Sequence, residues 1–229
     1  MGGHRAGDFA SRTIAKSAQW TGIPNSALDL KTRFVDRLII AHDEIRKQSE
    51  KLNGATVGAT LVALLAYEQH FACIWSGDSR IYLQRDDTLQ QLTTDHTEAM
   101  ELLREGAITE EEAANWPRKN VITRAIGVTD KPETDENYGV LRVGDVFLLC
   151  SDGLTGHVSD EEIADVLTRD GAQEICDALI ELTLSRGAKD NVTVLVVRVM
   201  PGEAMDDDDL PTNPGYGPPI NVDDWKAED

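Results

Sequence analysis

The sequence predicts one α+β domain, and three patterns support this class. Residues 29–51 carry apolar side chains at three- or four-residue spacing, which is typical of an amphipathic helix. Short apolar runs of strand length then follow one another closely, as in β-hairpins. Further along the chain, helical segments are grouped between strands. This grouping favours an α+β fold over the regular alternation of a Rossmann-like fold.

The first half of the domain is predicted to hold one long helix followed by short strands. The helix runs from Asp29 to about Lys51, and its outer face is charged. Three strand-like runs come next: Thr60–Tyr67, Phe71–Trp75 and Arg80–Gln84. Asp86 and Asp87 follow the third run and predict a hairpin turn.

The second half is predicted to combine helices with two buried strands. Residues 97–114 are helical in composition and are broken by Gly106, and Thr109 followed by three glutamates resembles an N-cap with acids in the first turn. Four further elements are expected, namely a buried strand at Val146–Cys150, helices at Asp160–Thr168 and Ala172–Arg186, and a second buried strand at Val192–Val199.

The composition narrows the choice of partners and compartment. The 41 acidic and 22 basic residues give a formal charge of −19, which disfavours nucleic acid and anionic membrane surfaces as partners. The longest apolar stretches are too short to cross a bilayer, and Met1 does not begin a signal peptide. Cys73, Cys150 and Cys176 are scattered, without CxxC spacing. We therefore expect a reducing, cytoplasmic environment.

A boundary is expected near residue 200, between a domain of residues 1–200 and a tail of residues 201–229. The tail contains nine acidic residues and one lysine, with few apolar side chains. Such a segment cannot bury enough apolar surface to offset its ordering entropy, so we predict that it is disordered. Within it, Ile220–Trp225 offers a tryptophan that can contact a partner or the domain.

Three short motifs place an aspartate at the end of a strand-like run. They are Ser76–Arg80 (SGDSR), Ser151–Gly153 (SDG) and Lys189–Asn191 (KDN). A carboxylate at the mouth of a buried strand is held by rigid backbone and still reaches solvent, as a site for a hard cation requires. Taken singly, each motif is better explained as an ordinary turn. Periodicity alone does not establish that Asp78, Asp152 and Asp190 converge in space.

The histidines and tryptophans are assigned structural roles. The histidines lack the spacing of a zinc site, and neither cysteine nor serine has the context of a nucleophile. His42 lies on a polar helix face and is predicted to be solvated, whereas His96 is predicted to make a hydrogen bond within a loop. Trp75 and Trp116 are predicted to pack in the core or in a surface segment.

Taken together, the motifs resemble those of protein phosphatases of the 2C type, the PPM family. Met1–His4 (MGGH) resembles the end of the family's DGMGGH motif, and further matches follow in the family's order. These are Gly58–Thr60 (GAT), Gly77–Arg80 (GDSR), Leu92–Thr97 (LTTDHT), a flap segment within Gly106–Gly127, Leu148–Leu154 (LLCSDGL) and Lys189–Thr193 (KDNVT). The resemblance extends from Met1 to about Val199. An ordered series of this many motifs is very specific, and the chain is identified as a member of the bacterial type of this family.

The resemblance implies a four-layer αββα sandwich, in which two antiparallel sheets are flanked by helices and metals bind at one end. It implies a protein serine/threonine phosphatase with two Mn²⁺ or Mg²⁺ ions, and in bacterial members a third. The ions activate a water that attacks phosphoserine or phosphothreonine. Asp152 and Asp190 match the ligands of one paired ion, and Asp78 matches the ligand of the third ion. Asn191 is expected to orient its neighbour, and Gly2 and Gly3 match an active-site loop. The implied partners are phosphoproteins that a cognate serine/threonine kinase has modified.

The start of the chain departs from the family. There, the aspartate that bridges both metals and the arginine that grips the substrate phosphate precede the position of Met1. The resemblance thus implies that the 229-residue chain lacks these groups and the opening strands, and that it is inactive in this form. We favour a start assigned at an internal methionine, because the later aspartates are intact. The alternative is a non-catalytic pseudophosphatase that binds phosphoproteins or a kinase.

Overall fold

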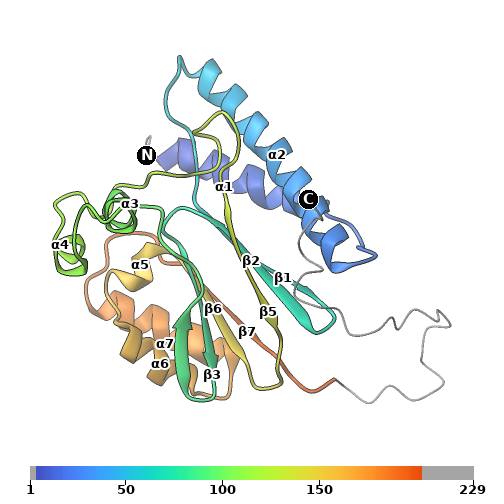
Figure 1. The fold of residues 1–229 in the computed structure, drawn as a ribbon, viewed down its shortest axis with the longest axis vertical. Helices are drawn as coiled ribbons and strands as arrows, with labels where there is room; N and C mark the ends of the chain where they lie inside the picture. The colour runs from blue at the N-terminus through green and yellow to red at the C-terminus, as the bar shows by residue number, and fades with distance from the viewer. Residues whose placement is uncertain (1–3, 203–229) are drawn as a thin grey trace.

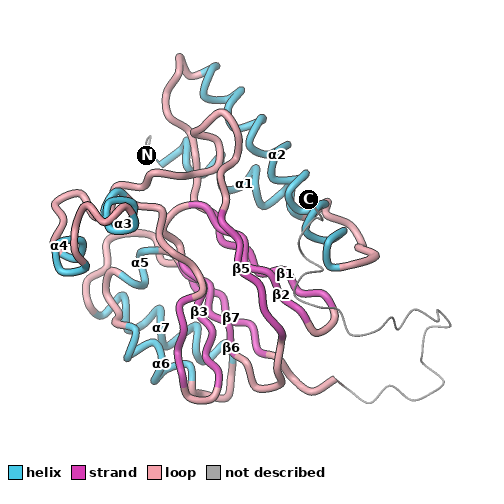
Figure 2. Tube along the Cα trace, viewed as in Figure 1, coloured by secondary structure: helices cyan, strands magenta, loops and turns pink. Residues whose placement is uncertain are grey.

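The computed structural model describes residues 4–202, which form two antiparallel sheets packed face to face between helices (Figures 1 and 2). Residues 1–3, with the predicted loop glycines Gly2 and Gly3, and residues 203–229, with most of the predicted tail, lie outside the described residues. One sheet has the strand order β1-β2-β5 and the other the order β4-β3-β6-β7. The strands are β1 Leu61–Tyr67, β2 His70–Ser76, β3 Arg80–Arg85, β4 Thr88–Gln91, β5 Asp135–Val140, β6 Val146–Cys150 and β7 Val194–Arg198. The predicted α+β class and the two-sheet sandwich are confirmed.

Helices flank the two sheets and lie at one end of the sandwich (Figure 1). They are α1 His4–Ala18, α2 Ala27–Lys51, α3 Glu98–Arg104, α4 Glu110–Ala114, α5 Asp152–Thr155, α6 Asp160–Leu167 and α7 Ala172–Ser185. Figure 1 shows α1 and α2 beside the β1-β2-β5 sheet, and α6 and α7 beside the other sheet. Helices α3 and α4 lie at one end of the sandwich (Figure 1). The predicted cap at Thr109 is confirmed, because its hydroxyl accepts from the Glu112 N–H at 3.3 Å and the Glu112 carboxylate accepts from the Thr109 N–H at 2.8 Å.

Alternation along the inner strands builds three apolar layers. Phe147 and Leu149 of β6 point between the sheets, where Phe147 meets Phe71 of β2 edge to face at a ring-centroid distance of 4.9 Å. Leu148 and Cys150 point the other way, into the core beneath α6 and α7. The equivalent outward residues of β2 pack with Phe34 and other side chains of α2. The four-layer arrangement follows from this period of two.

The prediction of a second buried strand at Val192–Val199 is wrong in its burial. In the described part of the chain β7 is an edge strand, and Leu195 and Val197 are 53% and 37% exposed. Their partners in β6 are Leu149 and Phe147, so both face the space between the sheets. A short apolar run does not reveal whether a strand has one neighbour or two, because the neighbour comes from elsewhere in the chain.

The prediction that His42 is solvated is also wrong. The side chain is fully buried, its Nδ1 accepts from the Gly127 N–H at 3.0 Å, and its Nε2 lies 3.1 Å from the Thr129 carbonyl oxygen. Burial lowers the pKa of His42. The loop that covers this histidine lies far along the chain, so the polar helix face around it gave a misleading signal.

The hairpin turn predicted at Asp86 and Asp87 is confirmed. Both residues have positive φ, 49° and 60°, and they join β3 to β4. Two central residues of this kind match the right-handed twist of an antiparallel pair. Among residues 4–202, no helix has both the length and the apolar character needed to cross a membrane.

Candidate active site

The sheet register brings the three aspartate motifs to one end of the β4-β3-β6-β7 sheet. Arg80, the first residue of β3, is paired with Cys150 at the end of β6, and Cys150 is paired with Val194 at the start of β7. Asp78 therefore precedes β3 at the same end at which Asp152 follows β6. Asp190 precedes β7 at this end as well. The sequence suggested the three turns, and the antiparallel pairing explains why they meet.

The turns that carry Asp152 and Asp190 are joined through backbone contacts. The Thr193 N–H donates to Ser151 Oγ at 3.0 Å, and the Ser151 N–H donates to the Thr193 carbonyl at 3.1 Å. Gly153 is needed here, because a Cβ at this position would lie 2.3 Å from the Asn191 carbonyl oxygen. The side-by-side position of the two turns thus depends on the glycine of SDG.

The carboxylates influence one another electrostatically. Burial, followed by the negative charge of Asp152, raises the pKa of Asp78 to about 6. Burial, followed by the charge of Asp190, likewise raises the pKa of Asp152. Like charges at this end of the sheet disfavour their own ionisation, and a cation placed among them would reverse that effect.

The donor set fits a hard divalent cation, although it is incomplete within the described residues. Among residues 4–202 no three His, Cys, Asp or Glu side chains lie close enough together to hold a metal ion by themselves. The electrostatic coupling instead defines two pairs that share one member, Asp78 with Asp152 and Asp152 with Asp190. One or two carboxylates with water in the remaining positions is a common arrangement for Mg²⁺. All the donors are oxygens, which suits Mg²⁺ and Mn²⁺.

The contacts of Asn191 with its neighbours are made by its backbone. The Asn191 N–H donates to Asp190 Oδ1 at 2.7 Å, so the peptide that follows Asp190 orients its carboxylate. The carbonyl oxygen of Asn191 lies 3.4 Å from Ser151 Oγ. The side chain of Asn191 has no part in either contact.

A cleft of about 560 Å³ opens beside Asp78 and Asp152. Its other wall is formed by α3 and by the part of the predicted flap from Glu110 to Asn120. Helix α3 contributes the apolar side chains Met100 and Leu103, and the flap contributes an acidic and a basic side chain, Glu110 and Lys119. The cleft thus places Asp78 and Asp152 opposite a wall that is apolar at α3 and carries charges of both signs in the flap.

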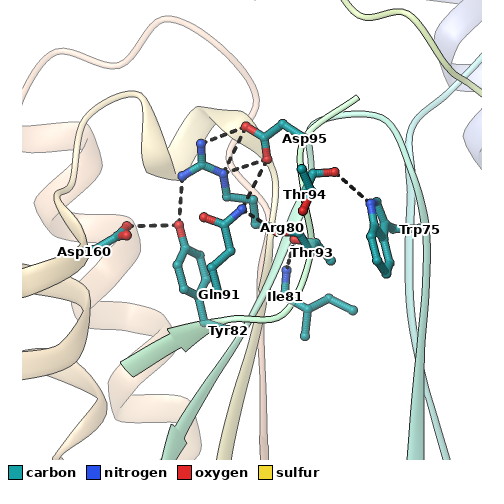
Figure 3. Close-up of polar contacts among 9 residues, drawn as sticks. All are labelled: Trp75, Arg80, Ile81, Tyr82, Gln91, Thr93, Thr94, Asp95 and Asp160. Carbon is teal, nitrogen blue, oxygen red and sulfur yellow. Dashed lines mark hydrogen bonds and ion pairs between the residues drawn. The ribbon is translucent and has the colours of Figure 1, made fainter. Parts of the chain in front are cut away.

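Arg80 lies in this cleft, but its guanidinium is already engaged (Figure 3). Nε and Nη2 donate to the two carboxylate oxygens of Asp95, and Nη1 donates to the Tyr82 hydroxyl at 2.9 Å. The Tyr82 hydroxyl donates to Asp160 Oδ1 at 3.0 Å. Burial disfavours the charged form of Arg80, but the hydrogen bond and charge of Asp95 outweigh burial and raise its pKa. Arg80 therefore fixes the GDSR turn and is not a free anion-binding group.

His96, Trp75 and Trp116 make side-chain hydrogen bonds near the carboxylates or in the flap. The predicted loop hydrogen bond of His96 is confirmed, because its Nδ1 accepts from the Gly77 N–H at 3.1 Å. Its Nε2 also contacts Asp135 at 3.2 Å, in a strand without any recognised motif. Trp75 is buried as predicted, and its Nε1 donates to the Thr94 carbonyl at 2.9 Å (Figure 3). Trp116 Nε1 donates to Glu98 Oε1 at 3.0 Å, as part of the flap.

Comparison with known proteins places the chain among phosphatases. Residues 1–104 match the family model for protein phosphatase 2C, and residues 102–200 match the model for stage II sporulation protein E. The serine/threonine phosphatase stp of Listeria welshimeri is 40% identical over 205 residues, which cover 86% of this chain and 81% of the relative. Protein phosphatase PhpP of Streptococcus pneumoniae is 36% identical over 203 residues, covering 86% and 82%.

Solved structures agree with these relatives. The serine/threonine phosphatase PstP/Ppp of Mycobacterium tuberculosis has a TM-score of 0.78 at 36% identity, covering 87% of this chain and 85% of that chain. The catalytic domain of PstP in complex with two manganese ions has a TM-score of 0.76 at 35% identity, covering 87% and 84%. With this fold and these relatives, the chain belongs to the protein phosphatase 2C (PPM) family of bacterial serine/threonine phosphatases.

Proposed function

We propose that the protein hydrolyses phosphoserine and phosphothreonine in other proteins and requires Mn²⁺ or Mg²⁺ to do so. The observation that carries this proposal is the meeting of Asp78, Asp152 and Asp190 at one end of the sandwich, beside an open cleft. The manganese ions in the related PstP domain support the choice of metal.

The carboxylates have separate roles in this proposal. Asp152 and Asp190 hold one ion of a pair, and Asp78 with Asp152 holds a third. The N–H of Asn191 keeps the Asp190 carboxylate in place. When bound, the divalent ions supply positive charge that activates water and stabilises the charge on the phosphoryl oxygens.

The remaining cleft residues bind and orient. The apolar α3 side chains Met100 and Leu103 limit the access of bulk water to one side of the cleft, and Lys119 offers a positive charge to an anionic substrate. Arg80 is held by Asp95 and acts on the turn rather than on the substrate. The natural substrates are proposed to be cytoplasmic phosphoproteins that a cognate serine/threonine kinase has modified. The catalytic unit is proposed to end near residue 200, just after β7.

Two alanine variants test this function. Both variants are made in the form of the protein that its native cells produce. We expect Asp152→Ala and Asp190→Ala each to lower Mn²⁺-dependent hydrolysis of a phosphothreonine peptide by about a hundredfold or more. The matched control is Asp177→Ala, because Asp177 is an exposed aspartate of α7 whose carboxylate accepts a hydrogen bond from Gln173 of the same helix.

Wild-type activity in both Asp152→Ala and Asp190→Ala would overturn the metal assignment. The wild-type assay is repeated with excess EDTA, which should abolish turnover. Applied to the 229-residue chain, the same assay tests the expectation that this form is inactive.

A further inference from the structure

His96 forms hydrogen bonds with Gly77 through both its backbone and its side chain. The His96 N–H donates to the Gly77 carbonyl oxygen at 2.9 Å, and the Gly77 N–H donates to His96 Nδ1 at 3.1 Å. Gly77 directly precedes Asp78, so these bonds fix the two peptides on either side of Gly77. The two peptides together fix φ and ψ of Gly77, and these angles set the direction in which the Asp78 side chain leaves the backbone.

The ring of His96 is itself held in one position and one tautomer. Nδ1 accepts from the Gly77 N–H, so the one N–H proton of the neutral ring lies on Nε2. Nε2 faces Asp135 Oδ2 at 3.2 Å. The ring stacks on Trp75 with an interplanar angle of 18°, and the residue is 3% exposed. Asp135 in turn accepts from Arg124 Nη1 at 3.0 Å. Few alternative positions are open to the imidazole.

The turn needs such a restraint. Gly77 has φ +111°, and a Cβ at this position would lie 2.4 Å from Thr60 Cγ2. Asp78 is nearly buried and faces the charge of Asp152, which repels it. Without a fixed backbone, an unneutralised Asp78 carboxylate would move away from Asp152.

We propose that His96, oriented by Asp135, is a positioning residue that holds the Gly77 peptide so that the Asp78 carboxylate stays beside Asp152 for a divalent cation. This inference rests on the metal-binding role in the proposed function. It assigns His96 no contact with substrate or metal. Its action passes through one backbone hydrogen bond.

The chain contains a matched control for this arrangement. His42 makes the same kind of contact, with Nδ1 accepting from the Gly127 N–H at 3.0 Å and Nε2 close to the Thr129 carbonyl oxygen. Gly127 also has positive φ, +96°, and lacks room for a Cβ. Its contacts lie in the core formed by α1 and α2 and not at the carboxylates. Loss of either imidazole removes the hydrogen-bond acceptor of a glycine N–H, but only His96 is next to the proposed metal site.

The test uses two variants, one that can replace the Nδ1 acceptor of the imidazole and one that can replace its Nε2 donor. In His96→Asn the amide oxygen reaches the position of Nδ1 and can accept from the Gly77 N–H, whereas in His96→Gln the amide reaches the position of Nε2 and leaves that N–H without its acceptor. Amide hydrogen exchange at Gly77 and Mn²⁺ binding by calorimetry are measured on the protein in the form that its native cells produce. Asp78→Asn defines the part of Mn²⁺ binding that depends on Asp78.

The proposal predicts a specific pattern. His96→Gln should weaken the Asp78-dependent Mn²⁺ binding by about tenfold or more, and His96→Asn by no more than about threefold. Exchange of the Gly77 amide should become about tenfold faster in His96→Gln than in His96→Asn. His42→Gln should leave Mn²⁺ binding within about twofold of wild type. If His96→Gln does not fold, Asp135→Ala, at a half-exposed side chain, is expected to weaken Mn²⁺ binding by about threefold or more.

Several results would overturn the proposal. One is His96→Gln with fast exchange at Gly77 but wild-type Mn²⁺ affinity, and another is His42→Gln weakening Mn²⁺ binding as much as His96→Gln. Unchanged exchange at Gly77 in His96→Gln would refute the backbone restraint itself. By contrast, a wild-type chain with no Asp78-dependent Mn²⁺ binding would refute the third-ion role in the proposed function, and the inference with it.

Discussion

Arg80 and Asp95 form a bidentate ion pair at the edge of the cleft. Nη2 lies 2.7 Å from Oδ2 and Nε lies 2.9 Å from Oδ1. The side chains are only 27% and 14% exposed. Through Tyr82, the same guanidinium is connected to Asp160 at the start of α6 (Figure 3). The GDSR turn is thereby joined to the LTTDHT segment and to the helical layer.

Removing one partner of this pair should destabilise the fold. Asp95→Ala leaves the half-buried charge of Arg80 without its counter-ion, and we expect the free energy of unfolding to fall by roughly 2–3 kcal/mol in urea denaturation. The control is Asp8→Ala, which removes an exposed pair with Arg12 and is expected to cost less than about 0.5 kcal/mol. Equal costs in the two variants would show that the Arg80–Asp95 pair has no special weight.

The stability of the metal-free protein should depend on pH through Asp78. Its pKa is raised from 3.8 to about 6, so the folded chain binds this proton more tightly than the unfolded chain does. The resulting stabilisation is fully present below about pH 4 and is lost as the pH rises through about 6, a change of about 2–3 kcal/mol. In EDTA, Asp78→Asn should therefore gain stability relative to wild type between about pH 4 and pH 7.

Urea unfolding at both pH values measures this difference. Saturating Mn²⁺ should remove much of the advantage of Asp78→Asn at the higher pH, because the cation neutralises the wild-type carboxylate. A stability difference between the two proteins that does not vary with pH would contradict the burial and charge repulsion assigned to Asp78.

The turn before Asp78 should not tolerate a side chain at Gly77. Gly77→Ala adds a Cβ that meets Thr60 at 2.4 Å, as well as the strain of positive φ, and is expected to cost roughly 2–4 kcal/mol of unfolding free energy. Gly144→Ala is the control, because Gly144 has φ +96° with no atom within 4 Å of the added Cβ, and it should cost about 1 kcal/mol.

A second substitution separates the clash from the strain. Thr60→Ser removes Cγ2 and keeps a hydroxyl for Ser79 Oγ, which lies 3.0 Å away. It should restore part of the stability lost in Gly77→Ala. Cβ of residue 60 remains, 2.7 Å from the added Cβ, so the rescue is expected to be partial. If Gly77→Ala costs no more than Gly144→Ala, the close contact is not important for stability.

The sequence predicted best those elements whose signals are local. The interior strands β2, β3 and β6 are apolar and end at Asp or Gly turns, and the capping box at Thr109 is complete within four residues. The aspartates at the ends of these strands could be proposed as ligands for the same reason. That Asp78, Asp152 and Asp190 lie together depends on strand register, and here the family resemblance supplied what periodicity could not.

The misses involve partners that are distant in the sequence. Strand β5 reads DENYGV, which has few apolar residues, and it is a strand because it pairs with the fully buried β2. His42 is covered by residues that lie 85 positions further along the chain. The exposure of Leu195 reflects the single neighbour of β7 within the described residues. No window of local sequence contains this information.

The central claim is that this end of the sandwich binds divalent metal through Asp152 and its neighbours. It is tested most directly by titrating Mn²⁺ at about pH 7.5 into the protein in the form that its native cells produce, with wild type, Asp152→Asn and the control Asp177→Asn compared by calorimetry. We predict that wild type and Asp177→Asn bind Mn²⁺ alike. Asp152→Asn should bind it at least about tenfold more weakly, because Asp152 is the carboxylate that interacts electrostatically with both Asp78 and Asp190. Wild-type affinity and stoichiometry in Asp152→Asn would contradict the assignment.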